Sequence, residues 1–319
     1  MKAIVVTSHG GPEVLEYKDV EPPQPSEGQL LVDVTYAGIN YIDTYYRSGT
    51  YPSNPPYIPG TEGCGRVVED PKGEIAPGTL VAWHAAPGSY AEQVAVDRNR
   101  LVAVPEGVAP EVAASMLLQG MTSHYLLHGV RETKPGDTMV VTAGAGGVGL
   151  ILTQMAAAEE ATVYSVVSSD EKEKLAYEAG ATKVFRYGED LAEQIKAENG
   201  GGGVDVVYDG VGQDTFEMCL NVTRPRGLVC SFGSASGDVE PFKIQELNAH
   251  GALFLTRPSL KHYVATDDEF LMRAQAVARA VEEGTVKIRI HPPYELKNAR
   301  QAHEDLQARN TTGSVVLKV

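Results

Sequence analysis

The sequence predicts an α/β protein in which a doubly wound parallel-sheet domain is inserted into a β-rich domain. Three observations lead to this architecture. Short β-like runs, cut by Gly and Pro, fill the chain up to about residue 105. A regular alternation of strands and helices begins at Asp137. A short α+β tail follows, and this order suggests that the tail returns to the first domain.

The first domain is expected to be mostly antiparallel, because its strands are short and separated by turn residues. Its expected strands cover residues 3–7, 30–37, 63–69, 79–83, 89–96 and 101–104. Two helical segments, 110–118 and 123–128, follow these strands.

The inserted domain is expected to alternate strands and helices after its first strand at residue 137. Further strands are predicted at 162–167, 204–208 and 228–232, and helices at 170–179, 189–198 and 213–220. Helices at 267–283 and 298–309 and a strand at 314–319 complete the tail. The expected domains are therefore residues 1–121 with 265–319 for the β-rich domain, and 122–264 for the inserted domain.

A glycine turn between the first strand and helix of the inserted domain is the most informative motif. Gly144, Gly146 and Gly149 fit the G-x-G-x-x-G spacing, which permits a tight turn and a close approach of main chain to phosphate. Because a complete βαβ unit surrounds it, the motif predicts a dinucleotide site rather than an α/β domain with an empty turn. The expected contacts are Gly144, Ala145, Gly146, Gly147, Val148 and Gly149.

The residues after the second strand of this unit indicate which dinucleotide binds. An NAD site needs a carboxylate there for the ribose 2′-hydroxyl, but this chain has Ser168 and Ser169. Asp170 comes later, where an acid is expected as a complement to the helix dipole. Two hydroxyls with Lys172 suit a 2′-phosphate, which favours NADPH, although Lys172 is equally compatible with a solvated helix lysine.

Composition limits the classes of partner. The net charge of −15 argues against binding nucleic acid or an anionic membrane and favours small molecules or proteins. No apolar run is long enough for a signal peptide or a membrane span, so a cytoplasmic protein is expected. The three cysteines, Cys64, Cys219 and Cys230, are widely spaced and show neither a disulfide framework nor a structural zinc motif.

Six segments together match a known family in order along the chain: residues 9–15, 38–49, 144–149, 208–212, 231–237 and 256–260. On these segments the sequence resembles the quinone oxidoreductase, zeta-crystallin-like, family of the zinc-free medium-chain dehydrogenase/reductase superfamily. The likeness covers nearly the whole chain. It implies a GroES-like catalytic domain, an inserted Rossmann domain, and a homodimer that pairs Rossmann edge strands, here the run 251–256.

The resemblance also implies site residues. Asn40 and Tyr45 are expected at the nicotinamide and substrate end, and Tyr51 at the pocket wall, where it can hydrogen-bond a quinone oxygen. The tyrosines are equally compatible with loop packing. Asp43 is either a proton relay or the cap of a short helix that starts there. The expected cofactor contacts are Asn40, Thr122, Lys172, Tyr187, Val211, Phe232, Gly233, Ser234 and Arg309, with N-capping as the alternative role for Thr122.

A catalytic zinc is not expected. The zinc enzymes of the superfamily have a cysteine and a histidine at two places where this chain has Asn40 with Asp43, and Thr61 with Glu62. His84 and Cys64 are imaginable substitutes, but such a pair fits packing better. A quinone is already electron-poor, so hydride transfer to it requires mainly orientation and exclusion of water.

The leading hypothesis is therefore a zinc-independent, NADPH-dependent quinone reductase that transfers a hydride or electrons. An NADPH-dependent reductase of the double bond of an enal or enone is the second enzyme hypothesis, because the same hydride geometry serves a conjugated carbonyl compound. An NADPH-binding structural or regulatory protein of crystallin type is the alternative from another class.

Overall fold

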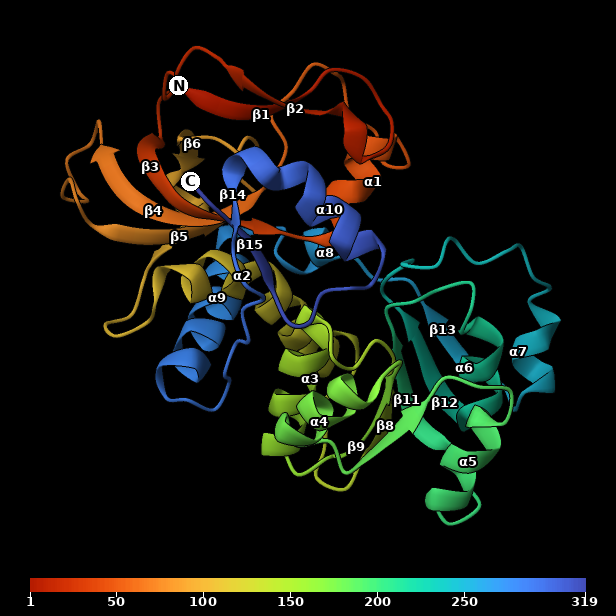
Figure 1. The fold of residues 1–319 in the computed structure, drawn as a ribbon. Coiled ribbons are helices and arrows are strands. Elements are labelled where there is room, and N and C mark those ends of the chain that lie inside the picture. The colour runs from red at the N-terminus through yellow and green to blue at the C-terminus, as the bar shows by residue number, and fades with distance from the viewer. The chain divides into compact units, whose positions relative to one another are not determined.

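The computed structural model describes residues 1–319, which form two compact units. Unit 1 contains residues 1–121, 264–284 and 288–319. Unit 2 contains residues 122–263 and 285–287. Figure 1 labels the helices and strands of both units.

Unit 1 is built on a seven-stranded sheet with the order β14-β15-β3-β4-β5-β7, in which β6 pairs with the long strand β3. The strands are antiparallel apart from β14 and β15. A separate hairpin joins β1 (Lys2–Val6) to β2 (Leu15–Asp19). The sheet strands are β3 (Gln29–Ile39), β4 (Glu62–Glu69), β5 (Leu80–His84), β6 (Gln93–Asp97), β7 (Leu101–Ala103), β14 (Tyr294–Glu295) and β15 (Val315–Lys318).

Four helices accompany this sheet. They are α1 (Tyr41–Ser48), α2 (Pro110–Tyr125), α9 (Asp267–Glu282) and α10 (Ala299–Gln307). The closing strand β15 pairs with β3, so the last segment of the chain completes the sheet that the first hundred residues begin. A core of alternating inward side chains, including Leu30, Val32 and Trp83, fills the space beneath the strands.

Unit 2 is a six-stranded parallel sheet with the order β10-β9-β8-β11-β12-β13. In chain order this is 3-2-1-4-5-6, the Rossmann arrangement, so the predicted fold class is confirmed. Figure 1 shows α3 and α4 on one face of the sheet and α5 and α6 on the other. The strands are β8 (Thr138–Val141), β9 (Thr162–Val167), β10 (Lys183–Arg186), β11 (Val204–Asp209), β12 (Thr223–Ser231) and β13 (Phe254–Thr256). The helices are α3 (Gly147–Ala158), α4 (Asp170–Glu178), α5 (Leu191–Glu198), α6 (Phe216–Val222), α7 (Gln245–Ala249) and α8 (Leu260–Tyr263).

Several predicted elements differ from the observed ones. The two helical segments expected at 110–118 and 123–128 are joined by α2, which runs on to Tyr125 and is followed by a π-helical turn over Leu126–Val130. Gly120 lets this helix approach α9 closely, because a Cβ there would lie 2.5 Å from Val277 Cγ1. Strand β10 was not predicted, since only Val184 and Phe185 of it are buried. Strand β12 begins at Thr223, earlier than expected, because Pro225 reads as a strand break in sequence. None of the helices combines the length and the apolar character that a membrane span requires.

Leucine truncations test which unit 1 positions maintain the core. Leu30 is fully buried in β3, whereas Leu271 on α9 is 44% exposed. We expect Leu30→Ala to lower the free energy of unfolding by about 2–5 kcal/mol, because it leaves a cavity. The matched control, Leu271→Ala, should change it by no more than about 0.5 kcal/mol. Denaturant unfolding followed by circular dichroism measures both values, and equal losses would contradict this account of the core.

Candidate active site

Asn40 is the N-cap of helix α1, and its extended backbone (φ −123°, ψ 153°) turns the chain from β3 into the helix. Asp43, three residues later, reaches back, and its Oδ2 accepts the Asn40 N–H at 2.9 Å. Sequence reasoning began this helix at Asp43. The helix in fact begins at Tyr41, so Asp43 caps from inside the first turn, as in a capping box.

The Asn40 carboxamide belongs to a buried chain of hydrogen bonds within unit 1. Its Nδ2 donates to Glu62 Oε2 at 2.7 Å, and its Oδ1 accepts from Gln119 Nε2 at 3.1 Å. Gln119 Oε1 in turn accepts from the Ser314 hydroxyl at 2.6 Å. The second Glu62 oxygen accepts the Leu118 N–H at 2.7 Å. Strand β4, helices α1 and α2 and the segment before β15 therefore fix this one carboxamide.

A second buried chain connects Asp43 to Arg47. Tyr90 donates its hydroxyl to Asp43 Oδ2 at 2.9 Å and lies 3.2 Å from His303 Nε2. Arg47 Nη1 lies 2.8 Å from His303 Nδ1. Because a guanidinium only donates, His303 Nδ1 is the acceptor and its Nε2 carries the hydrogen. The two buried charges of Arg47 and Asp43 are thus joined through neutral His303 and Tyr90.

Burial sets the ionisation of these groups. It raises the pKa of Asp43 to about 6, although hydrogen bonds from Asn40 and Tyr90 oppose the change. Burial also raises the pKa of Glu62 to about 8, because no cation pairs with this fully buried carboxyl. For His303, burial and then the Arg47 charge lower the pKa to about 3, which agrees with a neutral ring. Two carboxyl groups beside Asn40 therefore titrate well above their ordinary range.

The predicted tyrosines gather around α1. The ring centroids of Tyr45 and Tyr51 lie 5.1 Å apart, and those of Tyr46 and Tyr51 lie 5.7 Å apart. Tyr41 packs against Tyr45 at 5.5 Å with its edge toward the ring. The rings are only partly buried, so they form an aromatic surface next to Asn40 in sequence. Packing and substrate contact both remain compatible with Tyr45 and Tyr51.

In unit 2, the glycine turn joins β8 to α3 as the motif requires. A Cβ on Gly149 would lie 2.5 Å from the Ala143 carbonyl oxygen, so only glycine lets the helix approach the strand. Gly146 is the N-cap of α3, and with no side chain it leaves the first helix amides without a cap. The uncapped amides, including those of Gly147 and Val148, form an anion-binding helix terminus. Gly144 lies against Ser165, and Ala145 is buried.

The end of β9 carries the residues predicted at the adenosine phosphate. Lys172 Nζ donates to Ser168 Oγ at 3.3 Å, and Ser169 is the N-cap of α4, accepting the Lys172 N–H. The Tyr187 hydroxyl accepts the Ala143 N–H at 2.8 Å, which brings β10 to the glycine turn. Arg186 pairs with the exposed Asp170 at 2.7 Å and also with Glu173 of the same helix.

Two loops at the ends of β11 and β12 hold the remaining predicted cofactor residues. The main chain of Ser236 donates to the Val211 carbonyl at 2.8 Å, and Gly233 lies so close to Gly210 that a Cβ would be 2.5 Å from its oxygen. Buried Asp209 accepts hydrogen bonds from Thr142, Thr215 and the main chain of Gly212. Arg257 donates to the Phe232 carbonyl and to Ser234 Oγ. Val211, Phe232, Gly233 and Ser234 thus lie just beyond the carboxyl ends of two neighbouring strands, β11 and β12.

The remaining predicted cofactor contacts are Thr122 and Arg309. Thr122 is inside α2 rather than at its start, so N-capping is wrong as its alternative role. Arg309 follows α10 in the left-handed conformation (φ 61°), and its N–H donates to the Leu306 carbonyl. It thereby occupies the position after a helix end that glycine usually fills.

The candidate metal ligands are Cys64 and the half-buried His84. No group of three or more His, Cys, Asp or Glu side chains is arranged to hold a metal ion. Cys64 is fully buried in β4. Burial lowers the pKa of His84 to about 4, followed by the charge of Arg100.

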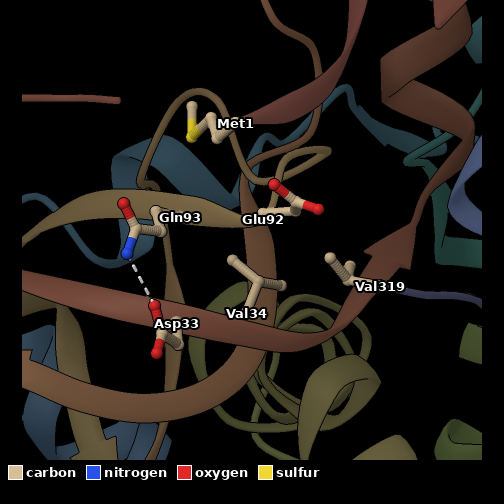
Figure 2. A pocket seen from close by; sticks show the side chains of 6 residues that line it. All are labelled: Met1, Asp33, Val34, Glu92, Gln93 and Val319. Carbon is tan, nitrogen blue, oxygen red and sulfur yellow. Dashed lines mark hydrogen bonds between the residues drawn. The ribbon is translucent and has the colours of Figure 1, made fainter. Parts of the chain in front are cut away.

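A pocket on unit 1 lies apart from the predicted residues. Its lining residues are Met1, Asp33, Val34, Glu92, Gln93 and Val319 (Figure 2). Gln93 donates to Asp33 at 2.7 Å, and Glu92 accepts the Lys2 N–H, so its polar groups are satisfied internally. It contains no residue of the candidate site.

Comparisons with known proteins identify the family. Residues 26–106 match the model of the alcohol dehydrogenase GroES-like domain, and residues 147–271 match that of zinc-binding dehydrogenases. The chain is 40% identical to a quinone oxidoreductase of Pseudomonas aeruginosa, over 99% of both chains, and 34% identical to a 2-haloacrylate reductase of a Burkholderia species, over 99% and 98%. A mycobacterial protein solved with NADPH superposes with a TM-score of 0.96 at 45% identity, covering both chains fully.

The chain belongs to the quinone oxidoreductase family of the medium-chain dehydrogenases/reductases. It is accordingly an oxidoreductase. The resemblance inferred from sequence is confirmed.

Within this quinone oxidoreductase fold, sequence reasoning missed most residues of the two buried chains. Glu62 was considered only as the occupant of a zinc-ligand position, and Gln119, Tyr90 and His303 received no role. One signal for Glu62 was present: it is an acid at the start of a glycine-rich, apolar β-strand. The partners of Glu62 come from distant parts of the chain, so no local pattern marks them.

Neutralising Glu62 should change how stability depends on pH. Because the pKa of Glu62 is raised, the folded state binds the Glu62 proton more tightly than the unfolded state does. The contribution of this proton to the free energy of unfolding is fully present below the ordinary pKa of 4.5 and is lost as pH rises to about 8. We expect Glu62→Gln to gain stability relative to the original protein across this window, by up to about 5 kcal/mol. Denaturant midpoints between about pH 5 and pH 9 measure the change. The control is Glu69→Gln, an exposed residue of the same strand; a pH-independent difference for Glu62→Gln would contradict the expectation.

Proposed function

We propose that the protein is an NADPH-dependent quinone reductase that works without zinc. The observation that carries the proposal is the glycine turn of unit 2 together with the lysine and serines, in place of an acid, after β9. Family membership and the mycobacterial relative that was solved with NADPH support the same cofactor.

The residues of unit 2 fit the two charged parts of NADPH. The uncapped amides at the start of α3 suit the pyrophosphate, and Gly149 gives them access because a side chain there would displace the turn. Lys172, Ser168 and Ser169 suit the 2′-phosphate, since they offer a cation and hydroxyl donors and no carboxylate. Tyr187, hydrogen-bonded to Ala143, would lie beside the same phosphate.

The residues around α1 suit the nicotinamide end of NADPH and the acceptor. NADPH supplies a hydride when it is bound. We propose that Asn40 and Tyr45 orient the nicotinamide and the acceptor, and that the Tyr51 hydroxyl donates a hydrogen bond to the acceptor oxygen. The aromatic surface of Tyr41, Tyr45 and Tyr51 suits a flat ring. Asp43 would contribute by fixing the helix start, because its Oδ2 accepts both the Asn40 N–H and the Tyr90 hydroxyl.

One relative favours a second class of acceptor, a conjugated double bond. A relative that shares 34% of its residues is a 2-haloacrylate reductase, which acts on a double bond. The same hydride geometry serves a conjugated carbonyl compound if a donor such as Tyr51 protonates the product. We favour the quinone because the relatives at about 40% identity are quinone oxidoreductases.

We also propose a cytosolic homodimer that pairs edge strands of unit 2. β13 is the last strand of the parallel sheet and has one unpaired edge. Phe254 on this strand is 64% exposed. An open edge with an exposed aromatic side chain favours pairing with a second copy of the same strand.

Lysine substitutions test the cofactor assignment. We expect Lys172→Ala to weaken NADPH binding about tenfold or more, because a charge-assisted contact to the 2′-phosphate is lost. NADH binding should stay unchanged, since NADH lacks that phosphate. Lys174→Ala on the same helix is the control, because Lys174 is exposed. Fluorescence titrations with both cofactors measure the effect, and equal weakening for NADPH and NADH would refute the assignment.

Turnover tests the reaction. We expect rapid oxidation of NADPH with 1,4-benzoquinone, at a rate that a chelator does not change, and slower oxidation with a conjugated enal. The absorbance of the nicotinamide follows both reactions. A faster reaction with the enal would favour the double-bond reductase, and tight NADPH binding without either reaction would favour a binding or structural role.

A further inference from the structure

The chain of hydrogen bonds through Asn40 has a single direction. Ser314 donates to Gln119, Gln119 donates to Asn40, and Asn40 donates to Glu62. All three bonds point toward Glu62, whose other oxygen accepts the Leu118 N–H. An ionised carboxyl only accepts, so it determines this direction.

The three side chains can also take the opposite direction, although the Asn40 oxygen then turns away from the Asp43 N–H that it accepts in the capping box. Each carboxamide and the hydroxyl both donate and accept hydrogen bonds. If Glu62 carries a proton on Oε2, it donates to the Asn40 oxygen. The Asn40 amide then turns its nitrogen to Gln119, and Gln119 turns its nitrogen to Ser314. The chain thus has two arrangements that differ in which Asn40 atom is presented at the start of α1.

We propose that Glu62 is a positioning residue whose proton sets the orientation of the Asn40 carboxamide, with the ionised form giving the orientation needed for hydride transfer. The proposal rests on the proposed function for the role of Asn40 at the nicotinamide. It assigns Glu62, Gln119 and Ser314 to the reaction without direct contact with cofactor or substrate.

Few titratable groups face Glu62, so its proton can be distinguished from theirs. The titratable groups that face it are Asp43 from α1, Tyr90 from the segment after β5, and His84, its partner across β4 and β5. Helix α2 and strand β3 approach it with the Ala114 carbonyl, Leu118, Gln119 and Gly38, which do not titrate.

These groups gain or lose their protons outside the pH range in which Glu62 titrates. Burial places the pKa of Glu62 at about 8, that of Asp43 at about 6 and that of His84 at about 4. Burial also raises the pKa of Tyr90 well above its usual range. A change near pH 8 in the orientation of Asn40 is therefore attributable to Glu62.

The first test is the pH profile of kcat for NADPH and 1,4-benzoquinone. We expect kcat to rise about tenfold through about pH 8 in the original protein. Glu62→Gln cannot ionise: its oxygen accepts from Leu118 and its nitrogen donates to Asn40, which fixes the reversed chain. Its kcat should remain at the low value with no inflection, whereas Glu69→Gln should keep the original profile. An inflection that survives in Glu62→Gln, or a flat profile in the original protein, would overturn the proposal.

The second test needs neither turnover nor a variant that folds. In the original protein labelled with ¹⁵N-asparagine, the side-chain amide of one asparagine should shift as pH passes about 8. Absence of any such titration would overturn the positioning role. If quinone reduction fails while this titration is observed, the proposed reaction is wrong and the proton-controlled orientation of Asn40 is retained.

Discussion

Unit 1 buries three ionisable side chains that have no oppositely charged side chain beside them, and the rest of this unit depends on that constraint. Asp43, Arg47 and Glu62 are all at most 2% exposed. None of them pairs directly with an opposite charge, so the two carboxyl groups accept hydrogen bonds from fixed neighbours and Arg47 donates them to fixed neighbours. These neighbours lie at the start of α1, in α2, in α10 and in the segment between β5 and β6. The demand for satisfied buried charges thus joins the start of the chain to its last helix and determines the position of α1.

The N-termini of α1, α4 and α3 differ in how their free main-chain N–H groups are satisfied. At α1, Asp43 returns to the Asn40 N–H, and at α4 the Ser169 hydroxyl accepts from Lys172. At α3, Gly146 provides no side chain, so the helix amides remain without an internal acceptor. Only α3 therefore retains the strong preference for an anion that an uncapped helix start has. This difference explains why the glycine turn is the phosphate end of the proposed site.

Much of unit 2 was predictable because its signals are local. The glycine spacing, the apolar run of β9 and the acidic first turn of α4 each lie within a few residues, and the structure has them where the sequence predicted them. β10 was missed because only two of its residues are buried, which is too short a pattern to recognise. The continuous α2 was missed because Gly120 interrupts the helical pattern locally, whereas the residue that it packs against, Val277, lies more than 150 residues away along the chain.

The buried chains of unit 1 were not predictable from local pattern, and the physical reason is general. A hydrogen bond between Ser314 and Gln119, or between Arg47 and His303, joins residues about 200 positions apart or more. Neither partner alone differs from an ordinary surface residue in sequence. The sequence does contain one sign of these chains. Glu62 is an acid followed by the small residues Gly63, Cys64 and Gly65 of a strand, and a buried acid must either be neutral or accept hydrogen bonds. The structure supplies such hydrogen bonds from Leu118 and Asn40, and the same arrangement gives a side chain of the proposed nicotinamide end a fixed direction.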